Sequence, residues 1–189
     1  MTPRFSGAVL CGGASTRFGT DKAFATVGDR LLIETALAAL HEAGAAEVFV
    51  VGGDQERIRD LGADFVGDAW PGEGPLGGLI TALEHAREPT VAVLACDHPA
   101  TGAPAVRSIV GAIGRADAAI PVVAGKRQVL HSAWRRTVAG RLTTRFDAGE
   151  RSIRRVLGEL DIVQVLDGDP CWYADIDTPG DLARHRRST

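Results

Sequence analysis

The chain has few cysteines, few aromatic residues and no long hydrophobic run. Its three cysteines, Cys11, Cys96 and Cys171, lie far apart and form no Cys-x-x-Cys pair, which disfavours a zinc cage or a disulfide framework. No stretch approaches the roughly 18 apolar residues of a membrane span, and residues 1–7 lack the apolar core of a secretory signal. An odd set of widely spaced thiols fits a reducing compartment, so we expect a cytoplasmic protein.

An excess of charge of one sign is also missing. The 21 basic and 24 acidic residues give a net charge of -3, so we expect neither a broad nucleic-acid surface nor a membrane surface. Hydrophobic residues make up 45% of the chain and charged residues 24%, which favours a folded globular protein over a disordered one. With 189 residues and neither an internal repeat nor a Pro/Ser-rich linker, residues 1–189 are predicted to form a single domain.

Short apolar runs alternate with longer amphipathic segments through the first half. Four runs have the near-continuous apolar character of buried parallel strands, at 7–10, 48–51, 63–66 and 91–95. Four segments carry apolar residues at helical spacing, at 30–43, 55–61, 76–86 and 103–113. Gly44 is placed to end the first helix and Asp54 to cap the second. This order predicts right-handed βαβ units and hence an α/β fold, a three-layer α/β/α sandwich with a Rossmann-like, mostly parallel sheet.

The second half of the chain is less regular. Strands at 118–123 and 129–134 are predicted to form a hairpin around the turn 124–127, which would make the sheet mixed. The remaining expected elements are helices at 136–146 and 152–160, a strand at 162–166, and a closing helix at 179–187 capped by Thr178.

Glycine is abundant, with 23 residues, and a glycine-rich loop follows the first strand. It is not a Walker A loop, because Gly19 is followed by Thr20-Asp21-Lys22, and its glycines do not form GxGxxG. It offers the backbone amides of Gly12 and Gly13, the Ser15 hydroxyl and two cations, Arg17 and Lys22. That combination suits a triphosphate undergoing transfer. A tight strand-to-helix turn with solvated charges would have the same composition.

Asp97 follows the fourth strand and precedes His98-Pro99. A carboxylate at such a strand end suits a divalent metal that bridges phosphates. Asp97 would equally suit the N-cap of the helix expected from residue 103. We interpret His98 as a neighbour of this site and not as a base.

Two further segments concentrate constrained or charged residues. Residues 68–79 contain four glycines and two prolines leading into a helix, which indicates either a backbone that contacts a ligand or simple loop punctuation. Residues 173–179 are predicted to form a short strand with Asp175 and Asp177 on one face. Either carboxylate would complete a two-carboxylate metal site with Asp97, and surface capping is the structural alternative.

These segments resemble a known family. LCGGASTRFGTDK at 10–22 is similar to the LAGGxSxRMGxDK signature of nucleotidyltransferases that activate a phosphorylated partner with a nucleoside triphosphate. DAWPGEGPLGG at 68–78 resembles the glycine-proline loop of the molybdenum cofactor guanylyltransferase (MobA) family of MobA-like NTP transferases. CDHP at 96–99, AGERS at 148–152 and DIDTPGDL at 175–182 also match this family in order, so the resemblance covers nearly the whole chain.

The resemblance implies a sheet of the nucleotide-diphospho-sugar transferase type and a Mg²⁺-dependent transfer of GMP from GTP to the terminal phosphate of molybdopterin or Mo-molybdopterin, with pyrophosphate released. The implied catalytic residues are Arg17, Lys22 and Asp97. Asp97 and Asp177 would bind the metal. Asp175, Asp177 and the segment 149–152 would lie towards the pterin. The implied nucleotide-binding residues are Leu10, Cys11, Gly12, Gly13, Ser15, Lys22, Asp68, Gly77, Gly78 and Asp97.

The sequence departs from the family pattern at three places. Phe18 stands where methionine is usual, Cys11 where alanine is common, and Gly52-Gly53 where some members have an asparagine that contacts the nucleotide. Base specificity is therefore open, and a nucleotidyltransferase that uses CTP or acts on a sugar or polyol phosphate is the first alternative. A non-catalytic nucleotide-binding accessory protein is the second. Transient contacts with proteins that deliver or accept the molybdenum cofactor would fit the guanylyltransferase that the resemblance implies.

Overall fold

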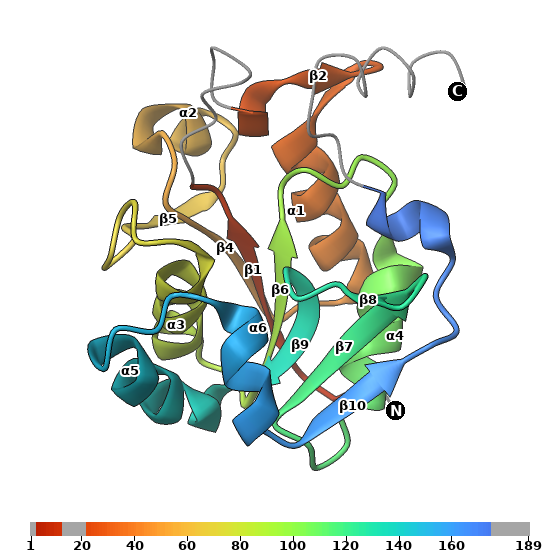
Figure 1. The fold of residues 1–189 in the computed structure, drawn as a ribbon. Coiled ribbons are helices and arrows are strands. Elements are labelled where there is room, and N and C mark those ends of the chain that lie inside the picture. The colour runs from red at the N-terminus through yellow and green to blue at the C-terminus, as the bar shows by residue number, and fades with distance from the viewer. Residues whose placement is uncertain (1–2, 13–21, 175–189) are drawn as a thin grey trace.

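A computed structural model describes residues 3–12 and 22–174, and its centre is one mixed β-sheet (Figure 1). The strand order is β10-β7-β9-β6-β1-β4-β5, with β8 paired to β7 outside this path. The strands are β1 (Ser6–Leu10), β4 (Glu47–Val51), β5 (Asp64–Val66), β6 (Thr90–Ala95), β7 (Ala118–Val123), β8 (Lys126–Arg127), β9 (His131–Arg135) and β10 (Ile162–Val165). A separate two-stranded ribbon pairs β2 (Thr26–Val27) with β3 (Arg30–Leu31).

The sheet is mostly parallel, as the apolar runs predict. β1 lies between β4 and β6 and pairs with both in parallel, and β5 extends the sheet beyond β4. β9 is antiparallel to its neighbours β6 and β7. The carboxyl ends of β1, β4, β5 and β6 therefore meet at one edge of the sheet, where α/β proteins bind ligands.

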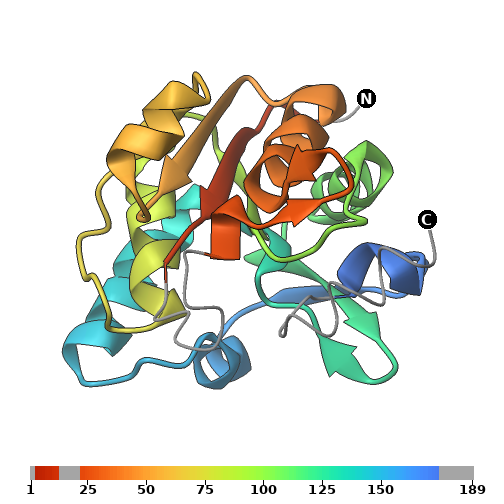
Figure 2. The same ribbon diagram turned by 90° about the horizontal axis from the view of Figure 1, so that it is seen from above.

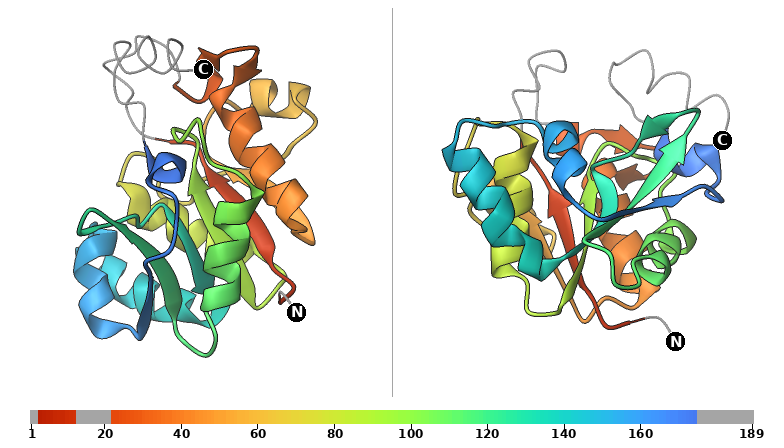
Figure 3. Two further views of the ribbon diagram at one scale, coloured as in Figure 1. Left: turned by 90° about the vertical axis from the view of Figure 1, so that its right-hand side faces the viewer. Right: turned by 60° about the horizontal axis from the view of Figure 1, so that its bottom comes forward.

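Helices cover both faces of the sheet and form the predicted three layers (Figures 2 and 3). Alternate residues of β1 show the division, because Val9 belongs to one apolar cluster and Ala8 to the other. One face packs against α1 (Leu32–Ala43), α2 (Gln55–Asp60) and α4 (Ala103–Ala112). The other packs against α3 (Pro75–His85), α5 (Ala139–Asp147) and α6 (Ile153–Val156). No helix within 3–12 and 22–174 is long and apolar enough to cross a membrane.

Local signals end and begin the helices where the sequence predicts. Gly44 follows α1 in a left-handed conformation with φ 90°, and the Asp54 carboxylate accepts from the Glu56 and Arg57 amides at the start of α2. Pro75 occupies the first turn of α3, where its missing N–H costs no helical hydrogen bond. Asp54 and Pro75 fix where the loops after β4 and β5 turn back into helices. These loops lie at the edge formed by the carboxyl ends of the parallel strands, which we call the ligand edge.

The structure differs from the sequence-based expectation in the second half. The tight hairpin joins β7 to β8 through Ala124-Gly125, and β9 then returns to pair with β7 and β6. The expected helix 136–146 starts with a 3₁₀ turn, η2 (Arg136–Val138), and the expected helix 152–160 divides into α6 and η3 (Leu157–Glu159).

The prediction of a strand that begins at residue 173 is wrong for its first residue. Tyr173 ends a 3₁₀ turn, η4 (Pro170–Tyr173), which the Asp169 carboxylate caps by accepting from the Cys171 amide. The Pro170 ring and this cap favour a helical turn over an extended chain. The rest of that strand and the predicted closing helix with Thr178 lie outside the described residues.

Candidate functional site

The loops after β1, β4 and β5 lie against each other at the ligand edge. The Cys11 amide donates to the Val51 carbonyl at 2.9 Å, and the Gly52 amide donates to the Val66 carbonyl at 3.0 Å. Gly52 has φ 72°, and a Cβ atom there would lie 2.5 Å from the Cys11 carbonyl oxygen. Only glycine lets these two loops approach so closely. The glycines after β4 are thus required by protein packing, whether or not a ligand also lies here.

The residues expected to line a nucleotide pocket at the end of β1 differ in how exposed they are. Cys11 is 2% exposed, and its Cβ lies close to the Gly53 backbone, so its side chain packs inside the protein. Leu10 is partly buried and Gly12 is exposed. Of these, Gly12 presents its backbone to solvent at the edge where β1 ends. Gly13, Ser15 and Arg17 lie outside the described residues, so their predicted roles stay predictions.

Lys22 and Asp97 form a charged contact at this edge. Lys22 begins the 3₁₀ turn η1 (Lys22–Phe24), whose Phe24 packs into the core beside α1. Asp97 comes two residues after β6. The Lys22 Nζ atom donates to Asp97 Oδ2 at 3.1 Å, and the two side chains are only 12% and 25% exposed. Two of the three residues that the resemblance implies to be catalytic, Lys22 and Asp97, are therefore brought together.

Asp97 does not cap the following helix, because Gly102 is the N-cap of α4. Its carboxylate lies between Lys22 and His98. Burial raises the pKa of this carboxyl, but the contacts with His98 and Lys22 outweigh burial and hold the pKa well below 3.8. Asp97 is therefore an anion throughout the neutral range.

The Asp97 Oδ1 atom is buried and faces His98. It lies 3.1 Å from His98 Nδ1, and neither atom has a hydrogen-bond partner outside this contact within the part of the chain that the structure describes. His98 is 8% exposed, and its ring packs against the buried ring of His131. The other Asp97 oxygen, Oδ2, lies beside Lys22, and a carboxylate oxygen held in this way is a ligand that Mg²⁺ prefers.

A two-carboxylate metal site is not visible among residues 3–12 and 22–174. These residues contain no group of three or more His, Cys, Asp or Glu side chains arranged to hold a metal. Asp97 suits one ligand position by its charge and its strand-end placement. Asp177 and Asp175 lie outside the described residues, so the second carboxylate stays a prediction.

Asp68 and the glycine-proline loop are ordered mainly by contacts within the protein. Asp68 Oδ1 accepts from the Trp70 amide at 3.0 Å and from the Thr81 hydroxyl of α3 at 3.3 Å. A Cβ atom at Gly77 would lie 3.0 Å from the Trp70 Cβ atom, and one at Gly78 would lie 3.8 Å from Leu10. Both glycines are buried within α3. Gly77 allows the loop to pack closely on that helix, whereas the space at Gly78 would admit a methyl group.

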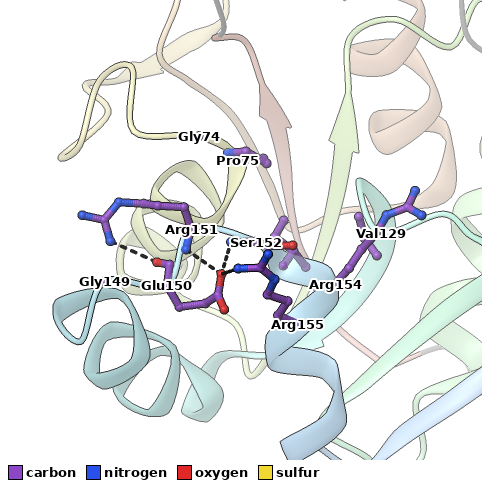
Figure 4. A pocket seen from close by; sticks show the side chains of 10 residues that line it. Gly74, Pro75, Val129, Gly149, Glu150, Arg151, Ser152, Arg154 and Arg155 are labelled. Atoms are coloured by element: carbon purple, nitrogen blue, oxygen red, sulfur yellow. Dashed lines mark hydrogen bonds and ion pairs between the residues drawn. The ribbon is translucent and has the colours of Figure 1, made fainter.

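A cavity of about 610 Å³ opens beside this loop (Figure 4). Gly74 and Pro75 at the start of α3 line one side, and the segment from Gly149 to Arg155 lines the other. Three arginines belong to its lining: Arg151, Arg154 and Arg155. Arg154 is exposed, and none of its contacts within the described chain is an ion pair. The cavity has the size of a small-molecule site and a cationic wall.

Arg151 ties the two sides of this cavity together. Its Nε atom donates to Glu73 Oε2 at 2.8 Å, its Nη1 atom donates to the Phe146 carbonyl at 2.7 Å, and its guanidinium lies 3.8 Å from the centre of the Phe146 ring. The Phe146 ring packs in turn on Trp70. The AGERS segment and the glycine-proline loop are thereby joined across 78 residues of sequence.

Glu150 shapes the same segment from within. The Ser152 and Arg151 amides both donate to its Oε1 atom at 2.8 Å. The Ser152 amide above all, with that of Arg151 and the nearby Arg155 and Arg145, lowers the pKa of the Glu150 carboxyl. The glutamate thus organises its own loop and leaves the arginines as the cationic part of the cavity.

Sequence reasoning missed three residues of this region: Glu73, His131 and Tyr173. His131 is fully buried in β9, and Tyr173 packs on it at 4.8 Å between ring centres. A histidine at an inward-facing strand position was a usable signal, since burying such a polar ring requires a partner. Glu73 lies in a loop where nothing in the local pattern identifies its partner Arg151.

Comparison with protein families finds one that covers most of the chain. The model of the MobA-like NTP transferase domain matches residues 7–164. A protein of Chloroflexus aggregans named "Probable molybdenum cofactor guanylyltransferase" is 33% identical over 94% of this chain and 91% of its own length. A protein of Deinococcus radiodurans with the same name is 30% identical over 93% and 91%.

Solved structures agree with this family. Molybdopterin-guanine dinucleotide biosynthesis protein A from Archaeoglobus fulgidus superposes with a TM-score of 0.79 at 25% identity, covering 97% of both chains. The 2-C-methyl-D-erythritol 4-phosphate cytidylyltransferase of Thermus thermophilus shares the fold, with a TM-score of 0.72 at 23% identity over 96% of both chains. The predicted nucleotide-diphospho-sugar transferase fold is confirmed.

Proposed function

The chain belongs to the MobA-like NTP transferase family and is a nucleotidyltransferase, and we propose that it transfers GMP from GTP to the terminal phosphate of molybdopterin. The observation that carries this proposal is the Lys22–Asp97 contact at the carboxyl ends of β1 and β6. Its curated relatives are named for the guanylyl transfer. A buried cation beside an ionised carboxylate, at the end of a parallel sheet, suits transfer of a phosphate-linked group.

The reaction needs no covalent enzyme intermediate. An oxygen of the terminal phosphate of molybdopterin attacks the α-phosphorus of GTP. A new P–O–P bridge forms, the bond from the α-phosphorus to the oxygen that bridges to the β-phosphorus breaks, and pyrophosphate leaves with that electron pair. The attacking oxygen already carries negative charge, so no side chain has to remove a proton. The work of the protein is therefore to align two anions and to neutralise the charge that builds on the leaving group.

Among the residues that the structure describes, Lys22 is a cation placed to neutralise the charge on the leaving pyrophosphate. In this structure its ammonium is shared with Asp97, so the lysine is already held near the reacting edge before any nucleotide binds. Arg17, predicted from the same loop, would add a second cation. Asp97 would hold a divalent cation, for which Mg²⁺ is the proposed ion, and that ion would supply Lewis-acid stabilisation of the phosphate oxygens.

The arginine-lined cavity would receive the acceptor. Molybdopterin carries a phosphate, and Arg151, Arg154 and Arg155 form a cationic wall of this cavity beside the glycine-proline loop. Arg151 is committed to Glu73 and to backbone carbonyls, so the exposed Arg154 is the better placed of the three to meet a phosphate. The mixed lining, with Pro75 and Val129 beside the arginines, also suits a ring system that has apolar faces and hydrogen-bonding edges.

A panel of nucleotides tests this function. The purified protein is incubated with Mg²⁺, molybdopterin and one of GTP, CTP, ATP or UTP, and both pyrophosphate and the mass of the pterin product are measured. We expect product only with GTP, at the mass of a guanine dinucleotide. Product with CTP would support the cytidylyl alternative, and pyrophosphate release with a sugar phosphate in place of molybdopterin would support the sugar-phosphate alternative.

A further inference from the structure

The geometry points to His98 as a positioning residue that fixes the orientation of the Asp97 carboxylate. His98 lies next to Asp97 in sequence, and its Nδ1 atom is 3.1 Å from Asp97 Oδ1. This oxygen is inaccessible, whereas the other oxygen, Oδ2, contacts Lys22. The inference rests on the proposed role of Asp97 in holding the divalent cation.

The imidazole closes one side of the carboxylate. A carboxylate that rotated about its Cβ–Cγ bond would present either oxygen to the nucleotide. With His98 Nδ1 against Oδ1, the oxygen that remains available to the reaction edge is Oδ2. Side chains that orient a metal ligand in this way commonly change metal affinity or activity by about 10- to 100-fold when they are removed.

His98 is itself held in place from behind. Its ring meets the His131 ring edge-on, with 5.7 Å between ring centres. The Thr101 amide donates to the His98 carbonyl at 3.3 Å, and the Thr101 hydroxyl lies 3.2 Å from His131 Nδ1. Tyr173 packs edge-on against the far side of His131 at 4.8 Å. Three buried rings, those of Tyr173, His131 and His98, therefore form a row that ends at the Asp97 carboxylate.

A matched pair of substitutions separates positioning from simple packing. His98→Asn keeps an N–H donor at the same number of bonds from Cβ as Nδ1, whereas His98→Gln moves the amide to the position of Nε2. His98→Leu fills similar space without a donor. A residue that only fills the core would rank the three variants by volume and stability. A positioning residue ranks Asn above both Gln and Leu.

The experiment measures GTP affinity by calorimetry with Mg²⁺ and with EDTA, in the absence of acceptor, together with kcat and KM for pyrophosphate release. We expect His98→Leu and His98→Gln to lower both kcat and the Mg²⁺-dependent gain in GTP affinity by about tenfold, with GTP affinity in EDTA unchanged. His98→Asn should stay within about threefold of the wild type. His41→Leu, at an exposed site of α1, is the control and should change neither quantity.

Two results would overturn the inference. One is a folded His98→Leu protein with wild-type kcat and wild-type Mg²⁺ gain. The other is a His98→Asn protein as impaired as His98→Gln, which also decides the matter where the leucine variant does not fold. Both results are read against an active wild type. A wild type that binds GTP equally with Mg²⁺ and with EDTA, and releases no pyrophosphate, would instead overturn the proposed function together with this inference.

Discussion

Lys22 Nζ lies 3.1 Å from Asp97 Oδ2, although 75 residues of sequence separate them. The contact forms because β1 and β6 are adjacent parallel strands whose carboxyl ends open at the same edge. It places a cation and an anion, both mostly buried, where a phosphate chain would be bound. Lys22, together with His98, holds the Asp97 carboxyl in its charged form before substrate arrives.

Replacing Asp97 by asparagine should remove most of the turnover and leave the fold intact. The amide is nearly isosteric but lacks the charge that would bind a divalent cation, so we expect kcat to fall by about 100-fold or more. Pyrophosphate release with Mg²⁺, GTP and molybdopterin measures the effect. Asp60→Asn, on the exposed surface of α2, is the matched control. Wild-type turnover in Asp97→Asn would show that the carboxylate has no catalytic part.

Gly52 and Gly62 provide a matched test of how closely the loops at the ligand edge pack. Both have φ 72°, but an added Cβ would lie 2.5 Å from the Cys11 carbonyl at Gly52 and would meet nothing within 4 Å at Gly62. Alanine at either site carries the left-handed backbone cost of about 1–2 kcal/mol. We expect Gly52→Ala to lose about 2 kcal/mol more than Gly62→Ala in urea unfolding. Equal losses would contradict the close approach of the two loops.

His131 should make the protein sensitive to mild acid. Burial, and then the charge of His98, lower the pKa of His131 from 6.5 to about 3. The unfolded chain therefore binds a proton below pH 6.5 that the folded chain refuses until about pH 3, so stability is complete above this window and falls as pH drops through it. The loss approaches about 1.4 kcal/mol per pH unit within the window.

Urea unfolding of the wild type and of His131→Phe between pH 7.5 and 4.5 measures how much His131 contributes to the pH dependence of stability. Phenylalanine keeps a ring between His98 and Tyr173 but has no proton to bind. We expect the stability of the variant to depend less steeply on pH than that of the wild type. Parallel curves for the two proteins would mean that His131 titrates in the folded state much as it does in the unfolded chain.

The Glu73–Arg151 pair should matter for the acceptor more than for stability. The two side chains are 48% and 42% exposed, so their attraction contributes less than about 1 kcal/mol. Glu73→Gln should leave Tm and the KM for GTP nearly unchanged and raise the KM for molybdopterin, because Arg151 would no longer join the cavity's two sides. Glu159→Gln, which breaks the comparably exposed Glu159–Arg145 pair, is the control. An unchanged KM for molybdopterin in Glu73→Gln would separate this pair from acceptor binding.

Much of the fold was predictable because its signals are local. The runs at β1, β4 and β6 are continuously apolar since helices cover both of their faces, and Gly44 and Asp54 act through their own backbone neighbours. The sequence predicts a hairpin turn of four residues, whereas the turn between β7 and β8 has two. The difference arises because β8 has only two residues, both exposed and charged. A two-residue strand carries too little pattern to be seen in sequence.

The candidate site was predictable as a set of residues but not as a set of contacts. The loop motif identified Lys22 and the strand end identified Asp97, yet their pairing depends on the strand order. The alternation of Tyr173, Asp175 and Asp177 predicts a strand. The actual place of Tyr173 against His131 arises from packing between η4 and β9, which no local pattern encodes.

The central claim is that this protein moves the α-phosphate of GTP onto molybdopterin. GTP labelled at the α-phosphate is incubated with the wild-type protein, Mg²⁺ and molybdopterin, and the label is followed by chromatography and mass. We predict that the label appears in the pterin product with one pyrophosphate released per product, and that labelled CTP gives none. Label that stays in GTP or appears only as free GMP would contradict the account.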